Sequence, residues 1–202
     1  MVPMISRILK PVATRAITPT AKAMLALGFT PNGVTIVGAI GVVVSSFSFY
    51  PSGHFFLGSI FVTVFVLSDL FDGTMARISE QGSSPWGGFL DSTIDRIADS
   101  SVLIAIILFL NQSSDSLVPV ALVALVTGVL VPYIRAKAES LGIECSGGFA
   151  ERTERLIVVL LAAGLHGLHV PFALAVGMWV LAGLGVITIG QRIMIVRNAS
   201  PQ

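Results

Sequence analysis

Long apolar stretches separated by short polar breaks constrain this chain more than any other feature of its sequence. A helix that crosses a bilayer needs about 20 mostly apolar residues, and we identify six such stretches. Only 11% of the residues are charged, whereas about 25% is usual in a soluble domain. The sequence therefore predicts an all-α polytopic membrane protein that forms a single domain over residues 1–202. The predicted transmembrane helices lie at about 33–50, 55–79, 86–111, 116–141, 153–168 and 170–196.

The segment before the first stretch is of a different kind. From Ile5 to Leu27 it mixes Ile, Leu, Val and Ala with four spaced cations. This pattern is typical of an amphipathic helix that lies in the headgroup region of a membrane. Prolines and charges interrupt its first twenty residues, so we expect no cleavable signal peptide.

The cations are distributed asymmetrically along the chain. All twelve Lys and Arg lie before the first stretch, around the second and fourth connections, or at the end of the sixth stretch. The other three connections, near residues 52, 113 and 168, contain none of them and hold all three histidines. Because Lys and Arg concentrate on the cytoplasmic side, we expect a cell-membrane protein with both termini and its acids, Asp115 excepted, in the cytoplasm.

Four aspartates gather at the junction of the second and third stretches. Asp69 and Asp72 are three residues apart and Asp91 and Asp95 are four apart, so each pair shares one helix face. The short Gly- and Ser-rich loop between them makes the two helices antiparallel and places the four carboxylates at one depth. Each charge inside a bilayer costs about 2.5–3.5 kcal/mol on insertion scales. The cluster therefore needs counter-charges.

The residues alone allow three interpretations of this cluster. Arg77 and Arg96 could neutralise the acids in a structural salt-bridge cluster, or the acids could form the ion pathway of a transporter. Alternatively, the carboxylates could bind a hard divalent cation such as Mg²⁺, Mn²⁺ or Ca²⁺. The only cysteine, Cys145, excludes a cysteine-built metal site. Gly73 and Ala76 leave space beside the acids, which favours a metal site for a phosphate or pyrophosphate substrate.

The order of these residues resembles the signature of a known family. Asp69-x2-Asp72-Gly73-x2-Ala76-Arg77-x9-Gly87-x3-Asp91-x3-Asp95 is similar to the motif of the CDP-alcohol phosphotransferases. The stretches at 30–35, 133–140, 147–159 and 177–192 resemble the actinobacterial phosphatidylinositol phosphate synthases of that family. The resemblance implies a Mg-dependent transferase that moves the phosphatidyl group of CDP-diacylglycerol to myo-inositol phosphate and releases CMP.

The resemblance also implies roles for single residues. Asp69, Asp72, Asp91 and Asp95 would bind two Mg²⁺ ions, which Mn²⁺ could replace, and Asp95 would also be the general base of an in-line attack. Ser83 is an alternative to Ser84 because of the loop length, and a helix cap is an alternative role for Asn32 and Thr35. The positions implied for CDP-diacylglycerol are Asn32, Gly33, Val34, Thr35, Asp69, Gly73, Ala76, Arg77 and Ser84.

A second set of cations, near the ends of the later stretches, indicates the acceptor. The set is Arg135, Lys137, Arg152, Arg155 and Arg192, of which the resemblance assigns all but Arg152 to the acceptor phosphate. Guanidinium groups bind phosphate in fork geometry, so a phosphorylated acceptor is favoured over choline, ethanolamine or serine. Glycerol 3-phosphate, the acceptor of phosphatidylglycerol phosphate synthases, makes the same demand and is the alternative. Ordinary flanking of helices by cations is the structural alternative.

The expected partners are CDP-diacylglycerol, inositol phosphate, membrane lipids and a second copy of the chain, since the family commonly forms homodimers. Gly177, Gly183 and Gly185 would permit close helix contacts, either within one subunit or between two. The net charge of +1 gives no indication of nucleic-acid binding, and none is expected.

Overall fold

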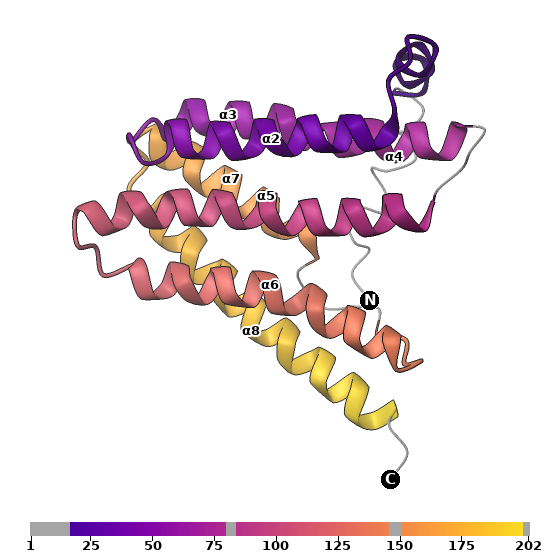
Figure 1. Cartoon of the computed structure of the whole chain (residues 1–202). Helices are drawn as coiled ribbons and strands as arrows, with labels where there is room; N and C mark the ends of the chain where they lie inside the picture. The colour runs from indigo at the N-terminus through magenta and orange to yellow at the C-terminus, as the bar shows by residue number, and fades with distance from the viewer. Residues whose placement is uncertain (1–16, 80–83, 146–150, 200–202) are drawn as a thin grey trace.

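The computed structural model describes residues 17–79, 84–145 and 151–199, and its regular structure is helical throughout these ranges (Figure 1). A helical segment over residues 17–26 precedes α2. The all-α prediction is thus confirmed, while the predicted N-terminal helix before residue 17 lies outside the described residues. The other helices are α2 (Pro31–Phe49), α3 (Phe55–Val66), α4 (Ser68–Ile78), α5 (Pro85–Gln112), α6 (Val118–Ser140), α7 (Arg152–Gly167) and α8 (Ala173–Ala199).

Two of the helices begin with the same local signal. Thr30 accepts a hydrogen bond from the backbone N–H of Gly33, and Ser84 accepts one from that of Gly87. In each case a proline follows the capping residue, where its missing N–H costs nothing. The cap considered for Asn32 or Thr35 is therefore wrong, because Thr30 performs that role for α2.

The second predicted stretch, 55–79, is two helices rather than one. α3 ends at Val66 and α4 begins at Ser68, with Leu67 between them. At this break α2 lies very close to the junction of α3 and α4. A methyl group on Gly38 would lie 1.8 Å from Ser68 Oγ, and one on Gly41 would lie 2.1 Å from the ring of Phe65. Only glycine lets α2 and the α3–α4 junction come so close.

Four helical segments are long and apolar enough to cross a bilayer, namely α2, α3 with α4, α6 and α8. Among the described helices, α5 and α7 do not meet that criterion. α5 is long enough, with 28 residues, but its first half carries a run of charges. α7 has only 16 residues and opens with Arg152. The chain is a multi-pass membrane protein.

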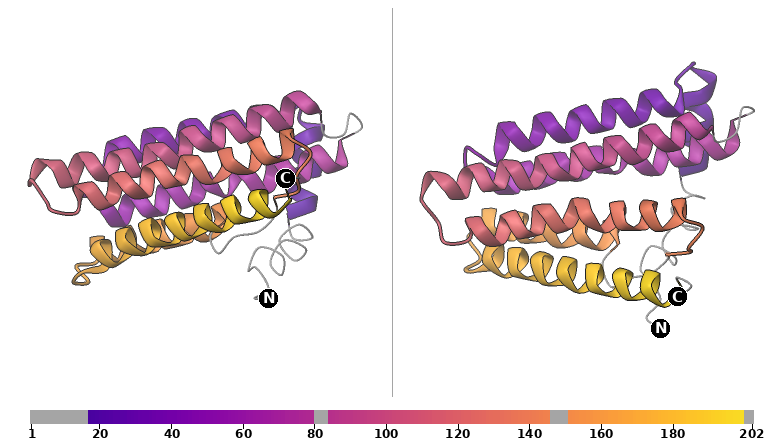
Figure 2. Two further views of the ribbon diagram at one scale, coloured as in Figure 1. Left: turned by 90° about the horizontal axis from the view of Figure 1, so that it is seen from below. Right: turned by 60° about the horizontal axis from the view of Figure 1, so that its bottom comes forward.

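The helices run lengthwise beside one another, and α8 packs against both α6 and α7 (Figures 1 and 2). Small residues set these contacts. A methyl group on Gly177 would lie 2.2 Å from Ala162 Cβ, and one on Gly185 would lie 2.2 Å from Thr127 Oγ1. Gly177 and Gly185 therefore serve packing within the subunit, whereas a methyl group on Gly183 would meet nothing within 4 Å.

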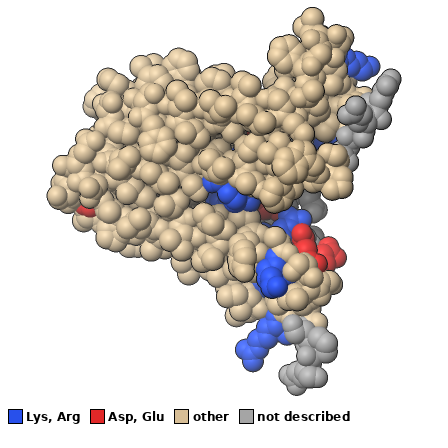
Figure 3. All heavy atoms as spheres, viewed as in Figure 1, with Lys and Arg blue, Asp and Glu red and all other residues tan. Residues whose placement is uncertain are grey.

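The two ends of the bundle differ in charge. The connections at 50–54, 113–117 and 168–172 lie at the left end in Figure 1 and contain neither Lys nor Arg. On the face drawn in Figure 3, the charged side chains lie mostly towards the right-hand end, and the left part is almost free of them. The asymmetry predicted from the order of the cations is therefore present in space.

The helical segment 17–26 closes one side of the charged end. Ala21 is fully buried and shares an apolar cluster with Val34 of α2 and Met75 of α4. Figure 1 shows this segment standing across the right-hand end of α2. It therefore fixes the beginning of α2 against α4, the two helices that carry Thr35 and Asp72.

Candidate active site

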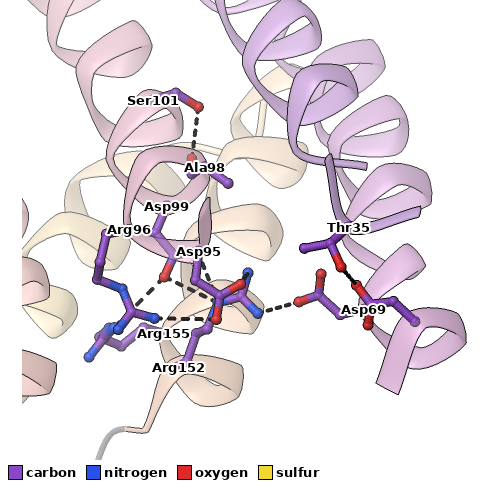
Figure 4. A network of polar contacts seen from close by, with 10 residues as sticks. Thr35, Asp69, Asp95, Arg96, Ala98, Asp99, Ser101, Arg152 and Arg155 are labelled. Carbon is purple, nitrogen blue, oxygen red and sulfur yellow. Dashed lines mark hydrogen bonds and ion pairs between the residues drawn. The ribbon is translucent and has the colours of Figure 1, made fainter. Parts of the chain in front are cut away.

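Asp72 is the predicted site acid that the protein encloses most, with an exposed fraction of 6%. Thr35 Oγ1 of α2 donates a hydrogen bond of 2.5 Å to Asp72 Oδ2 of α4 (Figure 4). Gly38, one helical turn beyond Thr35, permits this approach of the two helices. α2 therefore orients a carboxylate of the aspartate motif through a residue that the sequence assigned to substrate contact.

The largest group of contacts in the site centres on Arg152, the first residue of α7. Its guanidinium forms ion pairs with Asp69 of α4 and with Asp95 and Asp99 of α5 (Figure 4). Nη2 lies 2.9 Å from Asp95 Oδ1, and Nε lies 3.2 Å from Asp99 Oδ1. The consecutive helices α4 and α5 and the distant helix α7 thus meet at one side chain.

The counter-charges expected for the acids are only partly as predicted. Arg96 Nη2 lies 3.4 Å from Asp95 Oδ2. Arg77 is exposed and donates instead to Thr74 Oγ1, at 3.3 Å; among the described residues it makes no ion pair with an acid. The main counter-ion is Arg152, which the sequence analysis had grouped with the cations of the acceptor site.

The four motif carboxylates lie within electrostatic reach of one another. Asp69 and Asp91 both act as neighbouring negative charges on Asp72 and on Asp95. Within the described residues, neither Asp72 nor Asp91 forms an ion pair with a Lys or Arg. The predicted convergence of the motif acids from α4 and α5 is therefore present, with an excess of negative charge that a cation would neutralise.

The donor set suits a hard divalent cation, since it consists of carboxylate oxygens without sulfur or imidazole. As the side chains stand, however, no three His, Cys, Asp or Glu of the described part of the chain are placed to hold one metal ion. The guanidinium of Arg152 bonds both Asp69 and Asp95. The donor chemistry of these residues thus fits a hard divalent ion.

Five of the residues predicted to contact the nucleotide lie at the starts of α2 and α5, and the other four lie on α4. A methyl group on Gly87 would lie 3.2 Å from both Asn32 Oδ1 and Ser84 Oγ, which shows how near these residues are. Ser84 is described as the cap of α5, whereas Ser83 lies outside the described residues. The side chain of Val34 is buried in an apolar cluster.

Gly73 of α4 has no packing reason to be glycine. A methyl group there would meet no atom within 4 Å, although glycine in a helix costs about 0.5–1 kcal/mol relative to alanine. Gly73 lies between Asp72 and the half-buried Ala76 one turn on, so the space is next to the acids. The open space beside Gly73 is the kind of place where a ligand approaches the backbone.

The four residues predicted for the acceptor phosphate differ in environment. Arg192 is buried and donates to the carbonyl of Val131, and Arg155 is nearly buried with Asp99 at 3.9 Å. Arg135 is exposed and pairs with Glu139 at 2.8 Å, and Lys137 is exposed. Arg192 is a charged neighbour of both Arg155 and Arg135. The structure thus holds three of the four predicted cations in one region.

A small cavity of about 40 Å³ extends this region into the bundle. Arg96, Asp99 and Arg155 form its polar side, and Leu103, Leu156 and other apolar side chains of α5 to α8 form the rest. The cavity is thus lined both by Asp99, an ion-pair partner of Arg152, and by Arg155, one of the predicted acceptor cations.

Asp99 is not among the site residues predicted from the sequence, and the role of Arg152 as the counter-ion of the acids was not predicted either. A signal for Asp99 was present, because Asp91, Asp95 and Asp99 recur at intervals of four and must share a helix face. No comparable signal existed for Arg152, since its partner Asp69 is 83 residues away in the chain. Its position depends on how α7 packs, which no local spacing encodes.

Comparison with known proteins places these observations in context. A family model described as CDP-alcohol phosphatidyltransferase matches residues 28–193. The chain is 39% identical over 198 residues to phosphatidylinositol phosphate synthase of Streptomyces avermitilis, covering 94% of this chain and 81% of the relative. It is 42% identical over 184 residues to the enzyme of that name from Mycobacterium tuberculosis, covering 89% and 84%.

Two solved structures of the M. tuberculosis phosphatidylinositol phosphate synthase (PgsA1) are also similar. The structure with CDP-DAG bound gives a TM-score of 0.86 at 42% identity and covers 90% of this chain and 94% of that chain. The structure in complex with manganese and citrate gives a TM-score of 0.84 at 41% identity, with 91% and 90% covered. The likeness extends over nearly the whole chain in sequence and in fold.

Proposed function

Because the chain belongs to the CDP-alcohol phosphatidyltransferase family, we propose that it transfers the phosphatidyl group of CDP-diacylglycerol to myo-inositol phosphate and releases CMP. The observation that carries this proposal is the aspartate motif, whose two halves on α4 and α5 both reach Arg152, with Arg155 and the buried Arg192 nearby. The family model over residues 28–193 spans these positions, and the relatives named phosphatidylinositol phosphate synthase match about nine-tenths of the chain.

Asp69, Asp72, Asp91 and Asp95 would hold two divalent ions, with Mg²⁺ as the expected metal and Mn²⁺ as a substitute. Such ions stabilise negative charge on phosphoryl oxygens and on the leaving group. A solved relative contains manganese, and the all-oxygen donor set described above suits either ion. Thr35 keeps the carboxylate of Asp72 turned towards this group through its hydrogen bond.

Asp95 is the residue we assign as general base. It lies one helical turn beyond Asp91 and has Arg96 and Arg152 as ion-pair partners. A carboxylate in that position accepts the proton of the acceptor hydroxyl as the oxygen attacks phosphorus, and the reaction proceeds in line without a covalent enzyme intermediate. Its partners from two helices fix its direction before substrate arrives.

The nucleotide end of CDP-diacylglycerol would bind between the starts of α2 and α5 and the face of α4. Asn32, Gly33 and Thr35 line one side and Ser84 the other, while the open space at Gly73 admits the nucleotide. Arg77, exposed at the end of α4, is free to turn towards a phosphate. A solved relative has CDP-DAG bound.

The acceptor phosphate would bind Arg135, Arg155 and Arg192, with Lys137 at the rim. Three like charges held as neighbours repel one another, and an anion among them removes that cost. Arg155 lines the cavity that also contains Asp99, so the acceptor phosphate would be adjacent to the aspartate cluster. Glycerol 3-phosphate carries the same phosphate and is the acceptor to be tested against inositol phosphate.

We further propose six membrane crossings, with α5 and α7 completing the four apolar segments. α7 packs against α3 and α8, and α5 packs against α2 and α6. Ion pairs with Arg152 of α7 offset part of the charge of α5. The charged end, both termini and the site would face the cytoplasm, because the connections that carry Lys and Arg lie at that end and such connections concentrate on the cytoplasmic side. The protein would be a homodimer in the cell membrane.

The test is CMP release by purified protein in Mg²⁺ with CDP-diacylglycerol and one of three acceptors: inositol phosphate, glycerol 3-phosphate or free inositol. We expect turnover with inositol phosphate only. Turnover with glycerol 3-phosphate alone would reassign the protein as a phosphatidylglycerol phosphate synthase. Absence of CMP release with every acceptor, together with Asp-dependent ion flux in liposomes, would replace the transferase by a transporter.

A further inference from the structure

Arg152 bonds carboxylates that belong to different halves of the aspartate motif. Asp69 lies on α4 and Asp95 on α5, and the guanidinium contacts both from the first residue of α7 (Figure 4). Its side chain is 24% exposed and therefore largely removed from solvent. Without this cation, the facing carboxylates would repel each other across the gap between α4 and α5.

The same two carboxylates are those that a shared divalent ion would draw together. As they stand, no three acidic side chains of the described chain are placed around one ion, and the guanidinium bonds oxygens of both. An Arg cation and a divalent cation cannot occupy that place together, because like charges at contact distance repel strongly. A metal that binds through the oxygens now bonded by the guanidinium, Asp69 Oδ2 and Asp95 Oδ1, therefore displaces Arg152 from them.

Asp99 gives the displaced guanidinium a second partner. It lies one helical turn beyond Asp95 and outside the motif, with Oδ1 3.2 Å and Oδ2 3.4 Å from Arg152 Nε. Asp99 is thus an acid outside the motif that already bonds this guanidinium and can keep it as a partner. Arg155 Nη2 also lies 3.9 Å from Asp99.

We propose that Arg152 is a positioning residue that takes the place of the divalent metal in the metal-free protein and competes with it. The guanidinium keeps Asp69 and Asp95 together until metal arrives, and Asp99 then holds it aside. This inference rests on the proposed metal site, which is why its test measures metal binding in the wild type as well.

The test compares Mn²⁺ affinity among purified full-length variants, measured by electron paramagnetic resonance of free Mn²⁺ without substrate. R152Q removes the competing cation, and we expect it to bind Mn²⁺ more tightly by at least about fivefold, a usual size for coupling between two ligands. In the absence of metal its Tm falls, and Mn²⁺ raises that Tm by more than it does in the wild type. R197Q, which removes an exposed charge near the end of α8, is the matched control and keeps wild-type affinity.

R152K separates bonding geometry from charge and also serves if R152Q does not fold. Lysine keeps the positive charge but, as a point charge, lacks the fork that reaches several carboxylates at once. We expect R152K to bind Mn²⁺ more tightly than the wild type and less tightly than R152Q. Affinities of R152K and R152Q within about twofold of wild type, or weaker, overturn the proposal. A wild type that binds no Mn²⁺ overturns the proposed metal site itself, and with it this inference.

Discussion

The two ends of the bundle are held together by different physical means. At the site end, defined by Asp69, Asp95, Asp99 and Arg152, helices are joined by ion pairs, and Thr35 adds a hydrogen bond. The far end comprises residues 49–61, 109–117 and 166–172. There the helices are joined by the close packing of aromatic rings and backbone. There the ring of Phe55 packs against three others, with centroids 5.3, 4.8 and 4.7 Å away.

This difference separates function from stability. Ion pairs exchange partners when a charged ligand enters, so the site end is able to change its contacts during catalysis. Close-packed rings and backbone tolerate no such exchange, because interiors have few voids and transmit strain. Substitutions at the site end should therefore act mainly on turnover, and substitutions at the far end mainly on the free energy of unfolding.

The largest expected effect is that of Asp95→Asn. The amide cannot accept the proton of the acceptor hydroxyl, so CMP release should fall by about 10²–10⁴-fold, the usual contribution of a general base. The Tm should stay near that of the wild type because the side-chain volume is unchanged. The control is Asp115→Asn at the far end, where the amide oxygen can still accept from the N–H of Leu117. Full activity of the Asp95 variant would show that Asp95 is not the general base.

The next effect in size is that of Arg155→Ala. Loss of a hydrogen bond to a charged group costs about 1.5–3 kcal/mol, which corresponds to a rise in the KM for inositol phosphate of about 10- to 100-fold. The KM for CDP-diacylglycerol should change far less, and Arg192→Ala should show the same split with an added loss of stability, since Arg192 is buried. Initial-rate kinetics with each substrate varied in turn measure both constants. Equal rises in the two KM values would contradict a specific role in acceptor binding.

At the far end, Gly167→Ala should affect stability without affecting chemistry. A methyl group there would lie 2.2 Å from the backbone nitrogen of Phe56, and overpacking of this kind usually costs about 1–3 kcal/mol. Thermal unfolding in detergent should show a lower Tm, while CMP release per folded molecule stays at the wild-type value. Gly183→Ala is the matched control, because its methyl group meets nothing within 4 Å. A Gly167 variant with wild-type Tm and reduced turnover would reverse the division between the two ends.

The smallest pair of effects comes from removing one hydroxyl at each end. Thr35→Val deletes the hydrogen bond to Asp72, and Tyr50→Phe deletes the 3.3 Å contact between Tyr50 and Ser59. A single hydrogen bond contributes about 0.5–1.5 kcal/mol, so Thr35→Val should slow CMP release by about 2- to 10-fold. Tyr50→Phe should change the Tm slightly and leave the rate unaltered. Similar rates for the two variants would show that α2 does not orient Asp72.

Most of the helices could be predicted from the sequence, since hydropathy and turn residues act locally. The break at Leu67 could not, because it depends on Gly38 and Gly41 of another helix. Asp69, Asp72, Asp91 and Asp95 were accessible because three- and four-residue spacings fix a shared helix face. The contacts of Arg152 were not predictable, because they depend on the packing of α7 against α3 and α8, which brings its first residue to acids of α4 and α5.

The one-sided distribution of Lys and Arg has a consequence for the biogenesis of the protein. In the orientation we propose, the arginines that we assign to the acceptor phosphate are among the charges that decide which loops stay in the cytoplasm during insertion. A chain inserted the other way round would place its site on the side of the membrane away from the cytoplasm. Orientation and catalysis thus share residues, and a substitution of Arg135 or Arg155 should be examined for topology before its kinetics are interpreted.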